Sequence, residues 1–329
     1  MGRDCRPRQS GGILFFALHI PDGFVSVSVS SVGWFIAVVA LFVALRAPSG
    51  TTAEGPKAPA PLAGLLGAFV FAAQAMNFPV GVGTSGHLIG TALLTIVLGA
   101  WPAVVIVCSV LLVQCLLFQD GGLLAWGCNV FNMAILPSFC TAAVMRATSA
   151  LLGKGRPRTL LVGSALAGWL SVEAGAISCS LMLAVSGTSL LGPTLESMVA
   201  VHAPIGLVEG LITMMTVAFL LKTRPELVKG EEASSSSGWV GGGLLAAVAL
   251  ALASPLASKS PDGLDHVAEH LGFIEKTKPS FYQLFPDYKL PFITHPAATT
   301  ALAVVLGTLV VFGLAWLLAG RLTSVREAS

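Results

Sequence analysis

The sequence is poor in charged residues, since only 10% of its 329 positions are Asp, Glu, Lys or Arg. A soluble domain carries about 25% of such residues, so this chain cannot cover a water-facing surface of its own size. Hydrophobic residues make up 55% of it, which suits contact with lipid, where helices satisfy their backbone hydrogen bonds internally. The formal net charge of +2 is too small to indicate a nucleic-acid partner.

Several catalytic and metal-binding motifs are also missing. The chain contains no CxxC pair, no HExxH motif and no Walker A sequence. We therefore expect the six cysteines to be small apolar residues of helices, neither disulfide partners nor metal ligands. Any ATP hydrolysis must come from another protein. Two alternatives to a metal transporter stay open: a membrane-embedded enzyme, with Ser85 and His87 as a nucleophile pair, and a permease for another small solute.

Long apolar runs are what the chain does contain. A bilayer core about 30 Å thick needs about 20 apolar residues per helix. Two of the runs are short and are separated by Gly99-Ala100-Trp101-Pro102, which predicts a tight helical hairpin that does not span the bilayer fully. We predict an all-α polytopic membrane protein with about nine transmembrane helices, at approximately 32–46, 61–77, 87–100, 101–118, 125–147, 159–186, 204–222, 239–257 and 298–320.

Polar segments divide these runs into modules. Residues 223–238 form a hydrophilic linker that ends in a serine run. It separates a seven-span module, 18–222, from a two-span module, 239–329, which has a polar loop at 258–297. Residues 1–17 are a basic extension. They are either a signal peptide or the product of a wrong start, in which case Leu18 is the true first residue, read as methionine; the third possibility is that they are retained.

The basic residues predict how the chain is oriented in the membrane. Lysine and arginine concentrate in cytoplasmic loops. With the start of the mature chain outside and the C-terminus cytoplasmic, the outside loops hold four basic residues, Lys259, Lys276, Lys278 and Lys289. The inside loops then hold eleven: Arg46, Lys57, Arg146, Lys154, Arg156, Arg158, Lys222, Arg224, Lys229, Arg321 and Arg326.

His19 is a candidate metal ligand if the chain begins at Leu18. A histidine in second position offers its amide nitrogen and its imidazole Nδ1 next to the terminal amine, and these three nitrogens close two chelate rings around one ion. Three nitrogens in a plane suit a square-planar ion such as Ni(II) or Cu(II). Pro21 and the turn signal Asp22-Gly23 keep a helix from starting on the site. If the extension stays attached, the amine is lost and this interpretation fails.

His87 is the natural fourth ligand. It follows a glycine-rich stretch, 77–86, and glycines allow a backbone to pass close to a buried ligand. A capping or core histidine is the alternative interpretation.

Four further residues are predicted to support these ligands. Ser85 can cap the third helix, and Asn77 begins the glycine-rich stretch. Pro204 predicts a helix start, which places His202 at the outer surface of the membrane and Glu209 about two turns inside. Ionisable residues within a span are functional candidates because they are costly there.

Four segments together resemble the CbiM/NikM family, the substrate-binding membrane component of energy-coupling factor transporters for nickel and cobalt. They recur in order across about 18–222, and the tail from about 239 is similar to the two-span NikN-like partner with its PDGLE segment. The matching residues are His19-Ile20-Pro21-Asp22-Gly23-Phe24, Gly83-Thr84-Ser85-Gly86-His87, Asp120-Gly121-Gly122 with Asn129-Val130-Phe131-Asn132-Met133, His202-Ala203-Pro204-Ile205-Gly206 with Glu209-Gly210, and Pro261-Asp262-Gly263-Leu264-Asp265 in the tail.

The resemblance implies which atoms hold the metal. In this family they are the terminal amine, the amide and imidazole of the second-position histidine, and the histidine of the GTSGH segment; here these belong to Leu18 (as methionine), His19 and His87. The 17-residue extension departs from the family pattern and puts the amine in doubt.

The resemblance also implies a function. It is high-affinity uptake of Ni(II) or Co(II) across a bacterial inner membrane, by a non-enzymatic component without a cofactor. A transmembrane coupling protein and cytoplasmic ATPase subunits are the implied partners. The resemblance does not separate nickel from cobalt, or supply to cobalamin biosynthesis from supply to a nickel enzyme.

Overall fold

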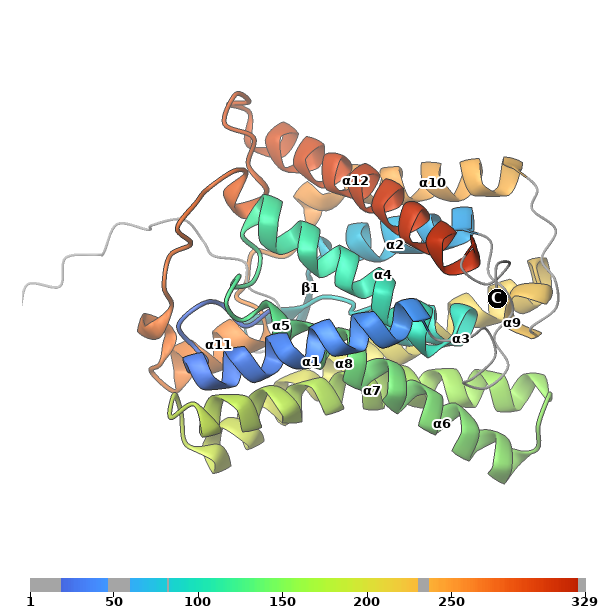
Figure 1. The fold of residues 1–329 in the computed structure, drawn as a ribbon, viewed down its shortest axis with the longest axis horizontal. Coiled ribbons are helices and arrows are strands. Elements are labelled where there is room, and N and C mark those ends of the chain that lie inside the picture. The colour runs from blue at the N-terminus through green and yellow to red at the C-terminus, as the bar shows by residue number, and fades with distance from the viewer. Residues whose placement is uncertain (1–18, 47–59, 82, 230–236, 325–329) are drawn as a thin grey trace, which may run out of the picture.

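The structure, a computed structural model, describes residues 19–46, 60–81, 83–229 and 237–324. Its long helices lie roughly along one direction, with α11 at one end of the bundle and the end of α12 at the other (Figure 1). The helices of the first module are α1 (Val27–Arg46), α2 (Ala60–Gln74), α3 (Thr91–Leu98), α4 (Ala100–Val113), α5 (Trp126–Val130), α6 (Leu136–Leu152), α7 (Pro157–Val185) and α8 (Leu191–Thr223). The short α9 (Glu226–Lys229) lies within the predicted linker.

The all-α membrane fold predicted from the apolar runs is confirmed. Within the described residues, six helices are long and apolar enough to cross a membrane, and two more, α2 and α10 (Ser237–Leu252), are apolar but shorter. The remaining predicted span, 87–100, contains α3, which has only eight residues and turns at Gly99 into α4. The expected connection of two helices at Gly99 is therefore present, but only α3 is short, because α4 and η1 together form a 19-residue helix that is long enough to cross a membrane.

One predicted boundary is wrong. We expected a helix to start at Pro204, but α8 begins at Leu191 and contains Pro204 in its interior. Proline lacks the N–H that would bond to the preceding turn, but helices inside a membrane tolerate it because neighbouring elements and local adjustments satisfy the freed carbonyl. The polar residues of 194–202 hid this first part of the helix from a count of apolar residues.

Glycines allow two helix pairs to approach closely. A Cβ on Gly168 of α7 would lie 2.6 Å from the Cα of Gly210 on α8, and a Cβ on Gly127 of α5 would lie 2.2 Å from the backbone nitrogen of Trp34 on α1. Small residues at such contacts let backbones meet, which is how helices associate where lipid removes the hydrophobic driving force.

Two π-helical turns interrupt the helices at one end of the first module. The first, η1 (Gln114–Phe118), continues α4 and ends with Gln119 in the left-handed region. The second, η2 (Phe131–Ile135), joins α5 to α6. Such turns inside α-helices are rare and occur frequently at functional sites.

A small antiparallel hairpin, not predicted from the sequence, joins α2 to α3. Its strands are β1 (Phe78–Gly81) and β2 (Thr84–Gly86), with Phe78 opposite Gly86 and Pro79 opposite Ser85. The glycines near its tip have positive φ values, 104° at Gly81 and 78° at Gly83, which suits a tight reversal of the chain.

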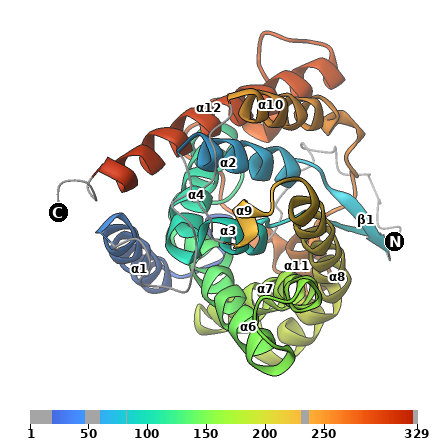
Figure 2. The same ribbon diagram turned by 90° about the vertical axis from the view of Figure 1, so that its right-hand side faces the viewer.

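The tail packs on one side of the first module. Both α10 and α12 (Pro296–Ser324) contact α2, on the opposite side of the bundle from α6 and α7 (Figure 2). Between them the chain passes over the end of the bundle through η3 (Ser254–Leu256), α11 (Gly263–His270), η4 (Ile274–Lys276) and η5 (Pro286–Tyr288). This crossing segment brings the tail to the end of the first module where the candidate ligands lie.

Candidate metal centre

The structure brings His19 and His87 together. His19 lies in the segment before α1, and His87 directly follows β2. Their rings are stacked, with centroids 5.7 Å apart and planes 11° from parallel, and both side chains are buried. Two nitrogens that each lie about 2.0–2.1 Å from one ion are at most roughly 4 Å apart. Rings at the observed spacing can present nitrogens within that range. Leu18, the third predicted contributor, lies outside the described residues.

The segment around His19 is held by its backbone. The Ile20 N–H donates to Asn129 Oδ1 (2.7 Å), and Asn129 Nδ2 donates back to the Ile20 carbonyl (3.1 Å). The Gly122 N–H donates to the same carbonyl (3.0 Å). A Cβ on Gly121 would lie 3.3 Å from the Cβ of His19, so glycine there leaves room for the histidine. These contacts fix the residue that carries the ligand.

A relay of side-chain amides fixes the tautomer of His19. The Ile89 carbonyl can only accept, so Gln74 must donate to it through Nε2 (2.8 Å). Gln74 Oε1 then accepts from Gln114 Nε2 (2.8 Å), and Gln114 Oε1 faces His19 Nε2 at 3.2 Å. His19 therefore carries its hydrogen on Nε2. Its Nδ1, the nitrogen that closes a chelate ring with the residue's own amide, is left with a lone pair.

That lone pair faces a carboxylate. Asp120 Oδ1 lies 3.1 Å from His19 Nδ1, and neither atom has an aligned hydrogen-bond partner within the described part of the chain. A lone pair and a carboxylate repel at this distance unless they share a cation, which is a proton on Nδ1 in the metal-free protein or a metal ion in its place. Burial raises the pKa of Asp120, but the neighbouring His19 and the Tyr288 hydroxyl outweigh it and lower that pKa below its ordinary value. The carboxylate is thus a stable anion beside the imidazoles.

His87 is held as a neutral ligand. Its Nδ1 lies 2.8 Å from the Leu88 carbonyl, and since that oxygen can only accept, Nδ1 carries the hydrogen and Nε2 keeps the lone pair. Burial, followed by the proximity of His19, lowers the pKa of His87 to about 4. A neutral imidazole whose other nitrogen donates to a carbonyl is the usual arrangement of a histidine that binds a metal.

Glu209 clamps the backbone that follows His87. The Ile89 N–H donates to its Oε2 (2.8 Å) and the Gly90 N–H to its Oε1 (2.9 Å). Glu209 is buried in α8, so its carboxylate satisfies two main-chain donors at the start of α3. The residue reaches the ligand segment through the backbone, without contacting an imidazole.

We expect Glu209→Ala to lower the thermal stability of the protein and to loosen His87. The substitution leaves the buried Ile89 N–H and the partly buried Gly90 N–H without their acceptor, and a buried donor left without a partner costs about 1–3 kcal/mol. Thermal unfolding of the purified protein should show a midpoint several degrees lower. Glu196→Gln, on the same helix but exposed, is the matched control and should leave the midpoint unchanged. An unchanged midpoint for Glu209→Ala would contradict the clamp.

Ser85 and Asn77 contact the tail. Ser85 was expected to cap the third helix, but it lies on β2; its N–H donates to the Pro261 carbonyl (2.8 Å) and its hydroxyl to the Ser260 carbonyl (2.8 Å). The helix instead begins after Gly90, with no side-chain cap. The Asn77 carbonyl accepts from the Ser258 N–H (2.8 Å). The hairpin that carries His87 is thus bonded to the segment that enters the tail's PDGLE-like motif.

We expected His202 at the start of a helix, but the structure places it inside α8. Its Nδ1 donates to the Met198 carbonyl one turn earlier (2.7 Å). A Cβ on Gly263, the glycine of the PDGLE-like motif, would lie 2.7 Å from its Cε1 and 2.9 Å from its Nε2. His202 therefore packs directly against the backbone of the tail, and this contact explains why only glycine fits at position 263.

No role was predicted from the sequence for four groups of this site. Gln74 and Gln114 orient His19. Asp120 stood only within a segment of family resemblance, and Tyr288 of the tail donates to its Oδ2 (2.6 Å). Burial, followed by the charge of Asp120, raises the pKa of Tyr288 well above its ordinary value, so it stays a donor. The sequence did contain one signal that could have indicated Gln74 and Gln114, because each is a polar side chain inside an apolar span, where it is costly.

The chain is similar to known metal transport proteins. Residues 19–227 match the family described as the cobalt uptake substrate-specific transmembrane region, CbiM. The chain belongs to the CbiM family. Residues 237–324 of this CbiM-family chain match the PDGLE domain.

Individual relatives agree with this membership. A protein of Archaeoglobus fulgidus described as a fused nickel transport protein, NikMN, is 32% identical over 310 residues, which cover 92% of this chain and 98% of that protein. The cobalt transport protein CbiM of Acetohalobium arabaticum is 35% identical over 216 residues, covering 63% of this chain and 83% of that one. The crystal structure of a truncated transition metal transporter covers 62% of this chain and 99% of its own, with a TM-score of 0.53 and 30% identity.

These findings establish what kind of protein this is. The CbiM-family chain is a multi-pass membrane protein that takes part in metal uptake, and it carries a NikN-like PDGLE tail fused to its substrate-binding module. It is a transporter component and not an enzyme, since its relatives are transport proteins. The two alternatives, a membrane-embedded enzyme with a Ser85–His87 pair and a permease for another small solute, are set aside.

Proposed function

We propose that this protein binds Ni(II) or Co(II) with high affinity between His19 and His87. The observation that carries the proposal is the pair of stacked, buried imidazoles, each with one nitrogen fixed as a donor and the other left with its lone pair. Imidazole suits both metals. In the part of the chain that the structure describes, no three His, Cys, Asp or Glu side chains converge on one point. The remaining ligands we assign to the amine of residue 18 and the amide of His19.

We assign the protein the role of substrate-specific component of an energy-coupling factor transporter. A transmembrane coupling protein and cytoplasmic ATPase subunits would act with it, because this sequence carries no Walker A motif. The distribution of lysine and arginine favours an inner-membrane orientation with His19 and the tail's crossing segment outside and the C-terminus in the cytoplasm. In this arrangement the ion meets the protein at the end of the bundle that holds His19, just before α1, and His87, just after β2.

Metal retention by the purified protein tests the proposal. A chain that starts at position 18 with methionine is loaded separately with nickel, cobalt or manganese, passed through gel filtration and measured by mass spectrometry. We expect stoichiometric nickel or cobalt and no manganese, because nitrogen ligands favour later metals of the series. His19→Ala should carry no metal. Equal retention by wild type and His19→Ala would contradict the proposed site.

A further inference from the structure

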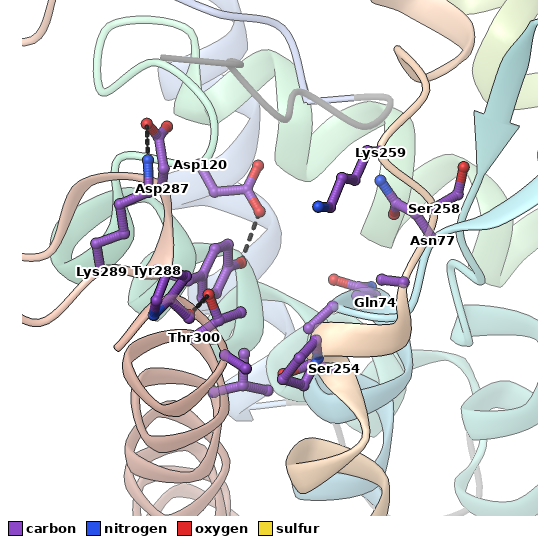
Figure 3. Close-up of a pocket in the computed structure, with 16 residues that line it drawn as sticks. Gln74, Asn77, Asp120, Ser254, Ser258, Lys259, Asp287, Tyr288, Lys289 and Thr300 are labelled. Carbon is purple, nitrogen blue, oxygen red and sulfur yellow. Dashed lines mark hydrogen bonds and ion pairs between the residues drawn. The ribbon is translucent and has the colours of Figure 1, made fainter. Parts of the chain in front are cut away.

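A chamber of about 390 Å³ lies next to the paired histidines, between the first module and the tail (Figure 3). Its walls come from the end of α2, the turn after η1, the residues that follow α10, and the segment from η5 to the start of α12. One water molecule takes about 30 Å³ in the liquid. The chamber therefore has room for a divalent ion that keeps its shell of water.

Polar side chains line one part of the chamber. Gln74, Asn77, Ser258 and Lys259 lie on one wall, and Asp120 lies across from Lys259 (Figure 3). Oxygen atoms of amides, hydroxyls and carboxylates suit a cation that is still hydrated. Gln74 is also the middle member of the relay that orients His19, so the chamber and the histidine site share a wall.

Asp120 lies between the chamber and the histidine site. Its side chain is about 10% exposed, it lines the chamber, and its Oδ1 lies 3.1 Å from Nδ1 of His19. Its Oδ2 accepts the hydroxyl of Tyr288, another residue of the chamber wall. An ion bound by this carboxylate would already be within reach of the nitrogen that closes the chelate ring.

Of the charged side chains that line the chamber, Lys259 is the one that faces Asp120. Asp287 and Lys289 pair with each other, with Nζ and Oδ2 3.6 Å apart. Lys259 points its amine into the chamber on the side that faces Asp120 (Figure 3), and the residue is exposed. A flexible lysine stem can turn its amine to water. Lys259 is therefore a positive charge that an arriving dication must displace.

Building on the function proposed above, we propose that this chamber is a capture site for hydrated Ni(II) or Co(II). Asp120 takes the place of one or more waters, holds the ion beside His19, and passes it to Nδ1. Carboxylate and water are ligands common to most divalent ions, whereas imidazole binds nickel and cobalt more selectively. Transfer from oxygen to nitrogen therefore runs toward the tighter site. Lys259 slows capture by opposing the charge of the ion.

The association rate of nickel distinguishes capture from simple support of the bound ion. Stopped-flow absorbance on the purified chain that starts at position 18 gives association and dissociation rates separately. Charge focused in a cleft raises association rates by about 10–10³-fold, so we expect Asp120→Asn to slow association about tenfold or more. Lys259→Met should accelerate it about two- to fivefold, less at high salt. Glu269→Gln, an exposed carboxylate on α11, removes the same charge outside the chamber and should leave the rate unchanged.

The outcomes separate this proposal from the metal site itself. If wild type retains no nickel, the proposed function fails, and the capture site fails with it. If wild type binds nickel through His87 but Asp120→Asn changes only dissociation, Asp120 supports the bound ion and the capture site is refuted. If Lys259→Met slows association, the chamber takes an anionic metal complex, which also overturns the proposal. Slower association with Asp120→Asn together with faster association with Lys259→Met supports it.

Discussion

His87→Ala is expected to weaken nickel binding about 10²–10³-fold. Sites with four ligands bind zinc with roughly 10–16 kcal/mol, so one ligand of four contributes about 2.5–4 kcal/mol, and each 1.4 kcal/mol is a factor of ten. Among the described residues, the imidazole in ring contact with His87 is that of His19, which is already assigned to the metal and cannot replace it. The backbone clamp of Glu209 stays in place, because it bonds to Ile89 and Gly90. The substitution should therefore remove the ligand and keep the fold.

Isothermal titration with nickel, supported by uptake of radioactive nickel into cells that contain the whole transporter, measures this effect. The matched control is His270→Ala, which removes an exposed histidine at the end of α11 and should bind and transport as wild type does. An unchanged melting temperature would show that His87→Ala is folded. Nickel affinity within a few-fold of wild type in such a folded variant would exclude His87 as a ligand.

Apolar runs sufficed to predict most of the membrane helices. Each helix in lipid must satisfy its own backbone, so a run of apolar residues has few alternatives to a helix. The predicted helix boundary was wrong in α8, where a polar segment inside the protein continues the helix. In α8 the first turns carry Thr194 and His202, both buried, and their environment comes from other parts of the chain. The small hairpin before His87 escaped prediction for a similar reason, because its outer edge is completed by Pro261 of the tail.

The candidate site was predictable only in part. His19 and His87 stand in recognisable local segments, so a pattern of neighbouring residues indicated them. Asp120 and Tyr288 are 168 positions apart, and Gln74 and Gln114 are 40 apart. Their roles depend on how α2, η1 and the tail pack together. A single sequence records the type of each residue, but contacts at such separations arise only in the folded chain.

The amine of residue 18 should matter as much as His87. We expect a chain that starts at position 18, with methionine there, to bind nickel about 10²–10³-fold more tightly than the same chain with a single alanine added in front. The reason is that the amine, like His87, is one ligand of four and contributes about a quarter of the binding free energy. The addition turns the amine into a peptide nitrogen but leaves His19, Asn129 and the glutamine relay untouched. The lower nickel affinity would therefore result from the loss of a ligand and not from a change in folding. Isothermal titration of both chains with nickel measures this difference.

Combining the two changes asks whether the amine and His87 bind the same ion. Groups that share one partner give non-additive effects, whereas independent sites give effects that add within about 0.3–0.5 kcal/mol. We expect the extended chain with His87→Ala to lose much less affinity than the sum of the single losses, since a site already missing one nitrogen no longer imposes the planar arrangement that suits nickel. Strictly additive losses would place the amine and His87 on different ions. Equal affinity of the extended and unextended chains would remove residue 18 from the ligand set. The carboxylate of Asp120, 3.1 Å from His19 Nδ1, would then be the next candidate for the fourth ligand.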